Sequence, residues 1–254
     1  MVAIRWARPE WHENTDSTQL LALQDPRPGR VVVARHQRAG QGRRGRVWTA
    51  PPGTALAVSA VVPAPPPPDL PWLPLVAGLA VARAVGEGAH AVPARLKWPN
   101  DLLLQDPADG QWRKACGVLA QVVPGRVVVG AGLNVRQRRA ELPVPTALSW
   151  ALARGAEELP RAEEVAWLGR YLDHLAAGLA DLPAAREGYQ GYCDTLGQQV
   201  RVELPGGAVR EGTALGLGPD GSLRVRGSDG GVSIHHVGDV VHVRAAGRYP
   251  AGHD

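Results

Sequence analysis

The sequence predicts an α/β (α+β) fold in which strands and helices form one larger domain and a small β-barrel follows it. Apolar runs of strand length recur in the first half of the chain, and runs with helical spacing lie between and after them. Five short strands separated by glycine turns follow. A chain of 254 residues can hold a large domain with a small one beside it.

The first expected elements alternate between helix and strand. Asp16-Ser17-Thr18 offers N-cap side chains, which predicts a short helix through Leu20 to Leu23. Val31 to Ala34 is typical of a buried strand, and the small and β-branched residues of Ala55 to Val62 predict another. The prolines of 64–68 predict a stiff surface connection.

The middle of the chain continues this pattern. Leu73 to Val85 is apolar on nearly all sides, which indicates a buried helix. The other expected elements are strands at Arg95 to Trp98 and Asp101 to Leu104 around a Pro99-Asn100 turn, hairpin strands at Ala115 to Val123 and Arg126 to Val135, and a helix between Arg161 and Ala180.

The last stretch changes to short strands with glycine turns, which suggests a small β-barrel. We place the boundary near Gly197, giving domains at 1–196 and 197–247. The expected strands are Gln199 to Leu204, Ala208 to Leu217, Ser222 to Arg226, Val232 to His236 and Val240 to Arg244.

Composition and charge limit the class of protein. Lys and Arg number 28 against 24 Asp and Glu, an excess smaller than a nucleic-acid-binding protein usually carries. The two cysteines, Cys116 and Cys193, form neither a disulfide framework nor a zinc-ligand pattern. No secretory signal opens the chain, and the longest apolar stretch is too short to span a bilayer. We therefore expect a reduced, cytoplasmic protein that does not bind membranes.

A loop rich in glycine and arginine, Gly40-Gln41-Gly42-Arg43-Arg44-Gly45-Arg46, stands out from this background. Its glycines match the dinucleotide-binding pattern, but Trp48-Thr49-Ala50-Pro51-Pro52 follows where that motif needs a helix. A P-loop is excluded too, because no Gly-Lys-Ser/Thr ending is present. The arginines suit phosphate, and the loop could close over a nucleotide; a solvated hairpin tip is the alternative.

Three further segments carry a family resemblance. They are Asp16-Ser17-Thr18-Gln19, Lys97-Trp98-Pro99-Asn100-Asp101, and Lys114-Ala115-Cys116-Gly117 followed by Gly130-Ala131-Gly132-Leu133-Asn134. Together with the arginine loop, in this order and at about this spacing, they resemble biotin protein ligases. The resemblance implies a mixed-sheet catalytic domain with flanking helices and an SH3-like C-terminal barrel. It also implies that biotin and MgATP form biotinyl-5′-adenylate, whose acyl group passes to a lysine of a biotin carboxyl carrier protein.

The resemblance assigns an ATP side of the site. Lys114 would bridge the biotin carboxylate and the α-phosphate, although a lysine at an exposed strand edge is the ordinary alternative. Lys97 and Asp101 would lie near nucleotide, metal and incoming lysine, with their separate roles open; a surface salt bridge is the alternative for Lys97. Arg43, Lys97, Asp101 and Lys114 are the expected catalytic residues. The expected ATP contacts are Arg43, Arg46, Trp48, Lys97, Asn100, Asp101, Lys114 and Asn134, with Mg²⁺ accompanying ATP and no metal ligand assigned.

The resemblance also assigns a biotin side. Ser17, Thr18 and Gln37 would hydrogen-bond the ureido group, and helix capping by Ser17 is compatible with that role. Trp48 would cover the bound ligand, or else pack in the core. The expected biotin contacts are Ser17, Thr18, Gln19, Gln37, Gly40, Gln41, Gly42, Arg43, Trp48, Lys114, Gly117, Leu119, Gly130 and Gly132.

Some residues depart from the family pattern or need another interpretation. Gln41 stands where the family more often has arginine, so one contact of the loop is weaker or made by the backbone. We interpret Cys116 as a small buried hydrophobe, with a reactive thiol as the alternative. His235 and His236 point oppositely on one strand, which predicts one core and one surface residue and no metal pair.

Two rival functions stay open at this level. A lipoate or octanoate ligase shares the catalytic architecture, and a nucleic-acid-binding module would use the basic loop with Trp48 as a stacking ring. About fifteen residues precede Asp16, too few for a helix-turn-helix, so we expect no repressor function and no specific DNA binding. Relatives that pair through the sheet also suggest a homodimer.

Overall fold

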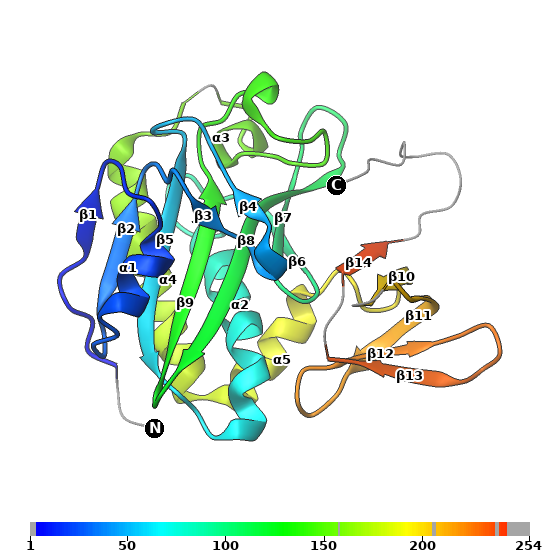
Figure 1. Ribbon diagram of the computed structural model, residues 1–254. Coiled ribbons are helices and arrows are strands. Elements are labelled where there is room, and N and C mark those ends of the chain that lie inside the picture. Colours follow the sequence, from blue (N-terminus) through cyan, green and yellow to red (C-terminus); the bar gives the residue numbers. More distant parts are fainter. Residues whose placement is uncertain (1–3, 157, 205–206, 237–238, 243–254) are drawn as a thin grey trace.

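The computed structural model describes residues 4–156, 158–204, 207–236 and 239–242 (Figure 1). The end of the expected strand Val240 to Arg244 and of the second expected domain lie outside these residues. Among the described residues, no helix is long and apolar enough to cross a membrane.

A seven-stranded mixed sheet forms the frame of the first part. The strand order is β1-β2-β5-β9-β8-β7-β6, and only the β1–β2 pair is parallel among these neighbours. The strands are β1 (Glu10–His12), β2 (Val31–Ala34), β5 (Ala55–Pro63), β6 (Ala94–Lys97), β7 (Asp101–Gln105), β8 (Trp112–Val123) and β9 (Arg126–Asn134).

Helices cover both faces of this sheet unequally. α2 (Leu73–Val85) lies behind the sheet with α4 (Arg161–Ala180) and α5 (Leu182–Tyr192), as Figure 1 shows. This face carries the main apolar core. On the other face, the short α1 (Thr18–Gln24) packs on a small cluster of Ala22, Val32, Val61 and Val128. The rest of that face is left for a loop and a cavity.

The loop on the open face contains β3 (Gly40–Gln41), a 3₁₀ turn at Arg43–Gly45, and β4 (Val47–Trp48). β3 and β4 pair with each other antiparallel, with Gly40 opposite Trp48. Two further 3₁₀ turns, Pro67–Trp72 and Arg139–Glu141, and the short α3 (Trp150–Ala153) complete the first part.

The second part is a five-stranded antiparallel sheet in the order β13-β12-β11-β10-β14. Its inward side chains, such as Val200, Val202 and Leu223, belong to the same apolar cluster as the main core. The division near Gly197 stays a prediction, because the core runs across it. The strands are β10 (Gln199–Glu203), β11 (Val209–Leu217), β12 (Leu223–Arg226), β13 (Val232–His235) and β14 (Asp239–His242).

A buried ionic cluster joins the back helices to the sheet. Glu164 of α4 is 1% exposed and accepts from Arg35 Nε at 2.8 Å. Arg136, just after β9, pairs with the other oxygen of Glu164. The carboxylate therefore ties the ends of β2 and β9 to the first turn of α4.

Several sequence predictions are confirmed at this level. α2, α4 and β2 have the expected bounds, and Ser17 caps α1 by accepting from Leu20 N at 3.4 Å. Cys116 is buried, His235 is buried and His236 is exposed. Four features were not predicted from the sequence: α5, α3, β1 and the β3–β4 pair.

Candidate active site

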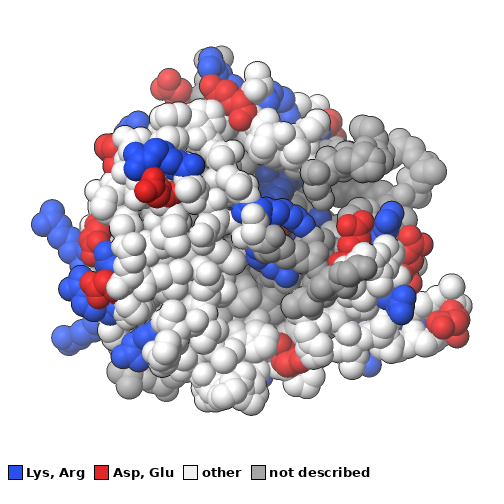
Figure 2. Space-filling view, viewed as in Figure 1, with Lys and Arg blue, Asp and Glu red and all other residues white. Residues whose placement is uncertain are grey.

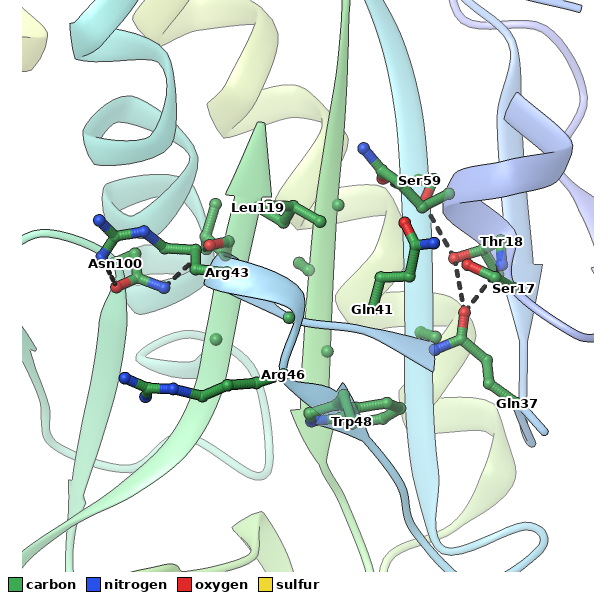
Figure 3. A pocket seen from close by; sticks show the side chains of 18 of the residues that line it. Ser17, Thr18, Gln37, Gln41, Arg43, Arg46, Trp48, Ser59, Asn100 and Leu119 are labelled. Atoms are coloured by element: carbon green, nitrogen blue, oxygen red, sulfur yellow. Dashed lines mark hydrogen bonds between the residues drawn. The ribbon is translucent and has the colours of Figure 1, made fainter. Parts of the chain in front are cut away.

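A cavity of about 860 Å³ of empty space, including its open mouth, lies on the front face of the sheet between α1 and the β3–β4 loop (Figure 3). It brings together six segments of the chain, at 17–19, 37–48, 57–59, 100–101, 114–119 and 130–132. The lining residues are Ser17, Thr18, Gln19, Gln37, Gln41, Gly42, Arg43, Arg46, Val47, Trp48, Ala57, Val58, Ser59, Asn100, Asp101, Lys114, Gly117, Val118, Leu119, Gly130, Ala131 and Gly132.

One end of the cavity is a buried network of neutral polar groups. Gln37 Oε1 accepts from Thr18 N at 2.8 Å and lies 3.1 Å from Thr18 Oγ1. Thr18 Oγ1 is 2.9 Å from Ser59 Oγ, which in turn is 3.0 Å from Gln19 Oε1. Gln19 Nε2 donates to Val128 O at 3.1 Å. Every polar side chain of this network is therefore held by another.

The hydroxyl groups of this network supply fewer protons than there are oxygen–oxygen contacts within it. The amide of Gln37 must present its oxygen to Thr18 N, and Gln19 must present its nitrogen to Val128 O, so both amide oxygens face the hydroxyls. Thr18 and Ser59 then have two hydroxyl protons for three oxygen–oxygen contacts. The cluster therefore retains capacity to accept hydrogen bonds from a ligand's N–H groups.

Donors are also present at the same end. The Ser17 hydroxyl accepts from Leu20 N, which leaves its own proton for a ligand oxygen. Gln41 lines the cavity and adds an amide. This end can thus bind a group that combines N–H donors with a carbonyl oxygen.

Glycines of β9 form a flat floor because neighbouring side chains occupy the space of a Cβ. A Cβ at Gly130 would lie 2.6 Å from Gln19 Oε1. A Cβ at Gly132 would lie 2.8 Å from Cε2 of Trp48, so the indole rests directly on the backbone of this residue. Trp48 lines the cavity and covers its floor.

The opposite end of the cavity is charged. Arg43 Nη1 donates to Asn100 Oδ1 at 2.9 Å, and Asn100 Nδ2 donates to Val118 O at 3.0 Å. Lys114 Nζ lies 2.7 Å from Asp101 Oδ1. Asn100 thus orients Arg43, and Asp101 holds the ammonium at the cavity.

The charge of this end is positive. Arg43, Arg46 and Lys114 are set against a single carboxylate, Asp101, among the lining residues. Figure 2 shows Lys and Arg atoms gathered in the hollow at the centre of this face. An anionic ligand portion is favoured there.

Most of the expected site residues meet in this cavity, but three do not line it. Gly40 lies behind it, where a Cβ would come 2.4 Å from Trp48 O. Lys97 lies opposite Asp101 in the strand register of the β6–β7 hairpin. Asn134 donates to Leu148 O at 3.2 Å and accepts from Gln137. The nucleotide contacts expected of Lys97 and Asn134 stay predictions.

Some lining residues were not found from the sequence. Ser59 is the most informative, since it is 1% exposed and joins Thr18 to Gln19. Ser59 is the single hydroxyl residue in the apolar run Ala55 to Val62, and this isolated polar position in the sequence could have indicated a site residue. Ala57, Val58, Val47, Val118 and Ala131 add apolar wall.

Known proteins match most of this chain. The model of the biotin/lipoate A/B protein ligase family matches residues 11–137, and the model of the biotin protein ligase C-terminal domain matches residues 195–243. A biotin--[acetyl-CoA-carboxylase] ligase of Mycobacterium tuberculosis is 37% identical over 227 residues, covering 85% of this chain and 80% of that protein. The chain belongs to the biotin protein ligase family.

Solved structures of biotin protein ligases share the fold. The ligase of Aquifex aeolicus in complex with biotin and ATP has a TM-score of 0.77 and 26% identity. The match covers 94% of this chain and 100% of that one. The Leishmania major ligase with biotinyl-5-AMP has a TM-score of 0.59 and 27% identity, covering 89% of this chain and 97% of that one. The likeness therefore extends over most of the chain.

Proposed function

We propose that the protein activates biotin with ATP to biotinyl-5′-adenylate and transfers the biotinyl group to a lysine of a biotin carboxyl carrier protein. The observation that carries this proposal is the two-ended cavity. Its neutral end is lined by Ser17, Thr18, Gln37 and Ser59, and its other end is cationic. Biotin has the matching shape, with a ureido group at one end and a carboxylate at the other.

The neutral end suits the ureido group. Ureido N–H groups would donate to the hydroxyls of Thr18 and Ser59, which lack protons for all their contacts. The ureido oxygen would accept from the Ser17 hydroxyl. A lipoyl dithiolane has neither N–H nor C=O, so it would leave these buried groups unpaired. Sites of this kind reject analogues without the hydrogen-bonding group by about 10⁴-fold or more.

The cationic end suits the reacting anions. In the first step a biotin carboxylate oxygen attacks the α-phosphorus of ATP, and pyrophosphate leaves. Lys114 would lie between carboxylate and phosphate and reduce their repulsion. Arg43, held by Asn100, would stabilise charge that develops on the phosphate oxygens.

In the second step the acceptor lysine amine attacks the acyl carbon, an amide forms, and AMP leaves with the bond electrons. The attacking amine must lose a proton. Asp101 is the carboxylate that lines the cavity, so it is positioned to hold the amine or take this proton once Lys114 has turned to the ligand.

A magnesium ion would accompany ATP. Among the described residues no group of three or more His, Cys, Asp or Glu side chains could hold a metal. Proteins commonly hold Mg²⁺ with one or two carboxylates and substrate phosphates. Asp101 is the lining residue that would supply a carboxylate oxygen, and the ion would neutralise phosphate charge.

Partners and location stay proposals. The relative BirA of Bacillus subtilis is named a bifunctional ligase/repressor, is 28% identical over 240 residues, and is 70% covered by the match. We propose that this chain acts without specific DNA binding and in the cytoplasm. Filter binding to promoter DNA tests the absence of specific DNA binding, and cell fractionation tests the location. Sedimentation of the purified chain tests the expected homodimer.

The decisive experiment measures pyrophosphate release and acceptor labelling. Purified protein is incubated with MgATP and either biotin or lipoate, and then with a carrier domain. We expect pyrophosphate release and carrier labelling with biotin and neither with lipoate. Activation of lipoate but not of biotin would refute the proposal. Lys114→Met should lower release by about 100-fold or more. Its side chain is 45% exposed, so the melting temperature should stay unchanged.

A further inference from the structure

Two C-terminal turns, one before β10 and one between β11 and β12, hold Trp98, the residue that leads into the charged end of the cavity. We propose that Thr195 and Gly221 are positioning residues, which hold Trp98 so that Asn100 and Asp101 meet Arg43 and Lys114. The second part of the chain would then set the geometry of adenylate formation. This inference rests on the proposed function.

Trp98 is fixed at two points from the C-terminal side. Its backbone N–H donates to Thr195 Oγ1 at 2.9 Å, and its indole Nε1 donates to Gly221 O at 3.0 Å. Its side chain is 2% exposed. The residue therefore cannot shift or turn without losing a buried hydrogen bond.

Thr195 is itself held by the last described strand. Because Trp98 N is a donor, Thr195 Oγ1 accepts there and can give its own proton to His242 Nε2, 3.1 Å away. His242 Nδ1 lies 3.7 Å from Asp194 Oδ2. Thr195 is 0% exposed and, unlike Ser59 and Thr18, does not line the cavity, which leaves it a holding role.

Gly221 brings a tight turn against α2. Its φ is +80°, and a Cβ there would lie 2.8 Å from Leu75 Cδ1. The same turn accepts a second indole hydrogen bond, from Trp72 Nε1 to Pro219 O at 2.7 Å. Two buried tryptophans thus contact one turn, but only Trp98 is followed closely by residues that line the cavity, Asn100 and Asp101.

The turn after Trp98 needs outside support. β6, which ends at Lys97, is an edge strand of the seven-stranded sheet, so it has one strand neighbour in the described chain (Figure 1). Asn100 and Asp101 follow within this hairpin and carry the contacts to Arg43 and Lys114. A displacement of about 1 Å at such a site can lower a rate by about 100-fold.

Matched variants separate positioning from stability. Trp98→Phe and Trp72→Phe each remove one buried indole donor to the same turn, so both should lower the melting temperature to a similar extent. We expect kcat for pyrophosphate release to fall about tenfold in Trp98→Phe, with the KM for biotin within twofold, since one hydrogen bond is lost at a positioned group. Trp72→Phe should keep its kcat within twofold.

Thr195 provides the second pair. Thr195→Val removes the hydroxyl but keeps the shape, and it should lower kcat like Trp98→Phe. Thr195→Ser keeps the hydroxyl and should restore kcat. Equal loss of kcat in the Trp98 and Trp72 variants, or the same kcat in both Thr195 variants, would overturn the inference.

A readout without substrate keeps this test independent of the proposed function. Amide hydrogen exchange over residues 97–105 should quicken in Trp98→Phe and Thr195→Val, and stay as in the wild type in Trp72→Phe. Unchanged exchange in all variants would refute the positioning role. If exchange responds as expected while the wild type releases no pyrophosphate with biotin, the proposed function fails and the support of the turn stands.

Discussion

Ser59→Ala tests the buried network at the neutral end of the cavity. The Ser59 hydroxyl is the group that donates to Gln19 Oε1, and Ser59 is 1% exposed, so its removal leaves this oxygen without its side-chain donor. Leaving a buried acceptor unpaired costs about 1–3 kcal/mol. For a chain of this size a loss of about 2 kcal/mol lowers the melting temperature by roughly 4–8 °C.

The measurement is denaturant unfolding and thermal melting of Ser59→Ala beside Ser228→Ala. Ser228 lies in an exposed turn, so its variant should stay within about 0.5 kcal/mol of the wild type. Biotin affinity should fall as well in Ser59→Ala, because the ligand would use the same hydroxyl.

A double-mutant cycle with Gln19→Met isolates the contact. Once Gln19 no longer presents an oxygen, the loss of the Ser59 hydroxyl leaves no buried acceptor unpaired. The double variant should therefore be less destabilised than the sum of the single variants, by about 1 kcal/mol. The reasoning is refuted if Ser59→Ala melts like Ser228→Ala and the cycle is additive.

Three further predictions concern the floor, the back of the sheet and the thiol. Gly132→Ala should displace the Trp48 indole and weaken biotin binding about tenfold by titration calorimetry, whereas Gly169→Ala, which meets nothing within 4 Å, should leave affinity unchanged. Glu164→Gln should lower the unfolding free energy by about 3 kcal/mol in urea, because Arg136 and Arg35, both partly buried, lose the charge of a buried carboxylate, and of the two only Arg35 keeps another carboxylate partner in the described chain, Glu13. A loss under about 1 kcal/mol would contradict this. Burial raises the pKa of the Cys116 thiol to about 12, so the thiol stays protonated at pH 8. Iodoacetamide should therefore label Cys116 only after unfolding. Rapid labelling of Cys116 in the folded chain would contradict this.

Local signals made much of the fold predictable. Ser17 caps α1 through its own side chain, and the continuous apolar run of Leu73–Val85 fits a helix buried on almost every side. α5 gave no such signal. It begins with Leu-Pro, contains Gly188 and Gly191, and buries only Ala185 and Tyr189, so its apolar stripe is too narrow to recognise.

The cavity shows a different limit of sequence reasoning. Motifs indicated Thr18, Gln37, Gly130 and Gly132, because each stands in a short segment with a recognisable pattern. Ser59 has no such segment, and its importance comes from the antiparallel register that sets it opposite Gly130 in β9. A polar residue in an apolar strand can be seen in the sequence, but its partners depend on the pairing of distant strands.

The charge of the cavity explains why one loop cannot perform the chemistry alone. Gln41 supplies no charge, so the cations of the lining are Arg43, Arg46 and Lys114, and Asp101 offsets part of their charge while it pairs with Lys114. A carboxylate and a triphosphate bring more negative charge than this lining can neutralise. On the proposed function, binding of these anions would compete with Asp101 for Lys114 and would call for a divalent cation. Asp101 would then be released from the lysine, and arrival of the first substrates would free the carboxylate that we propose for the second step.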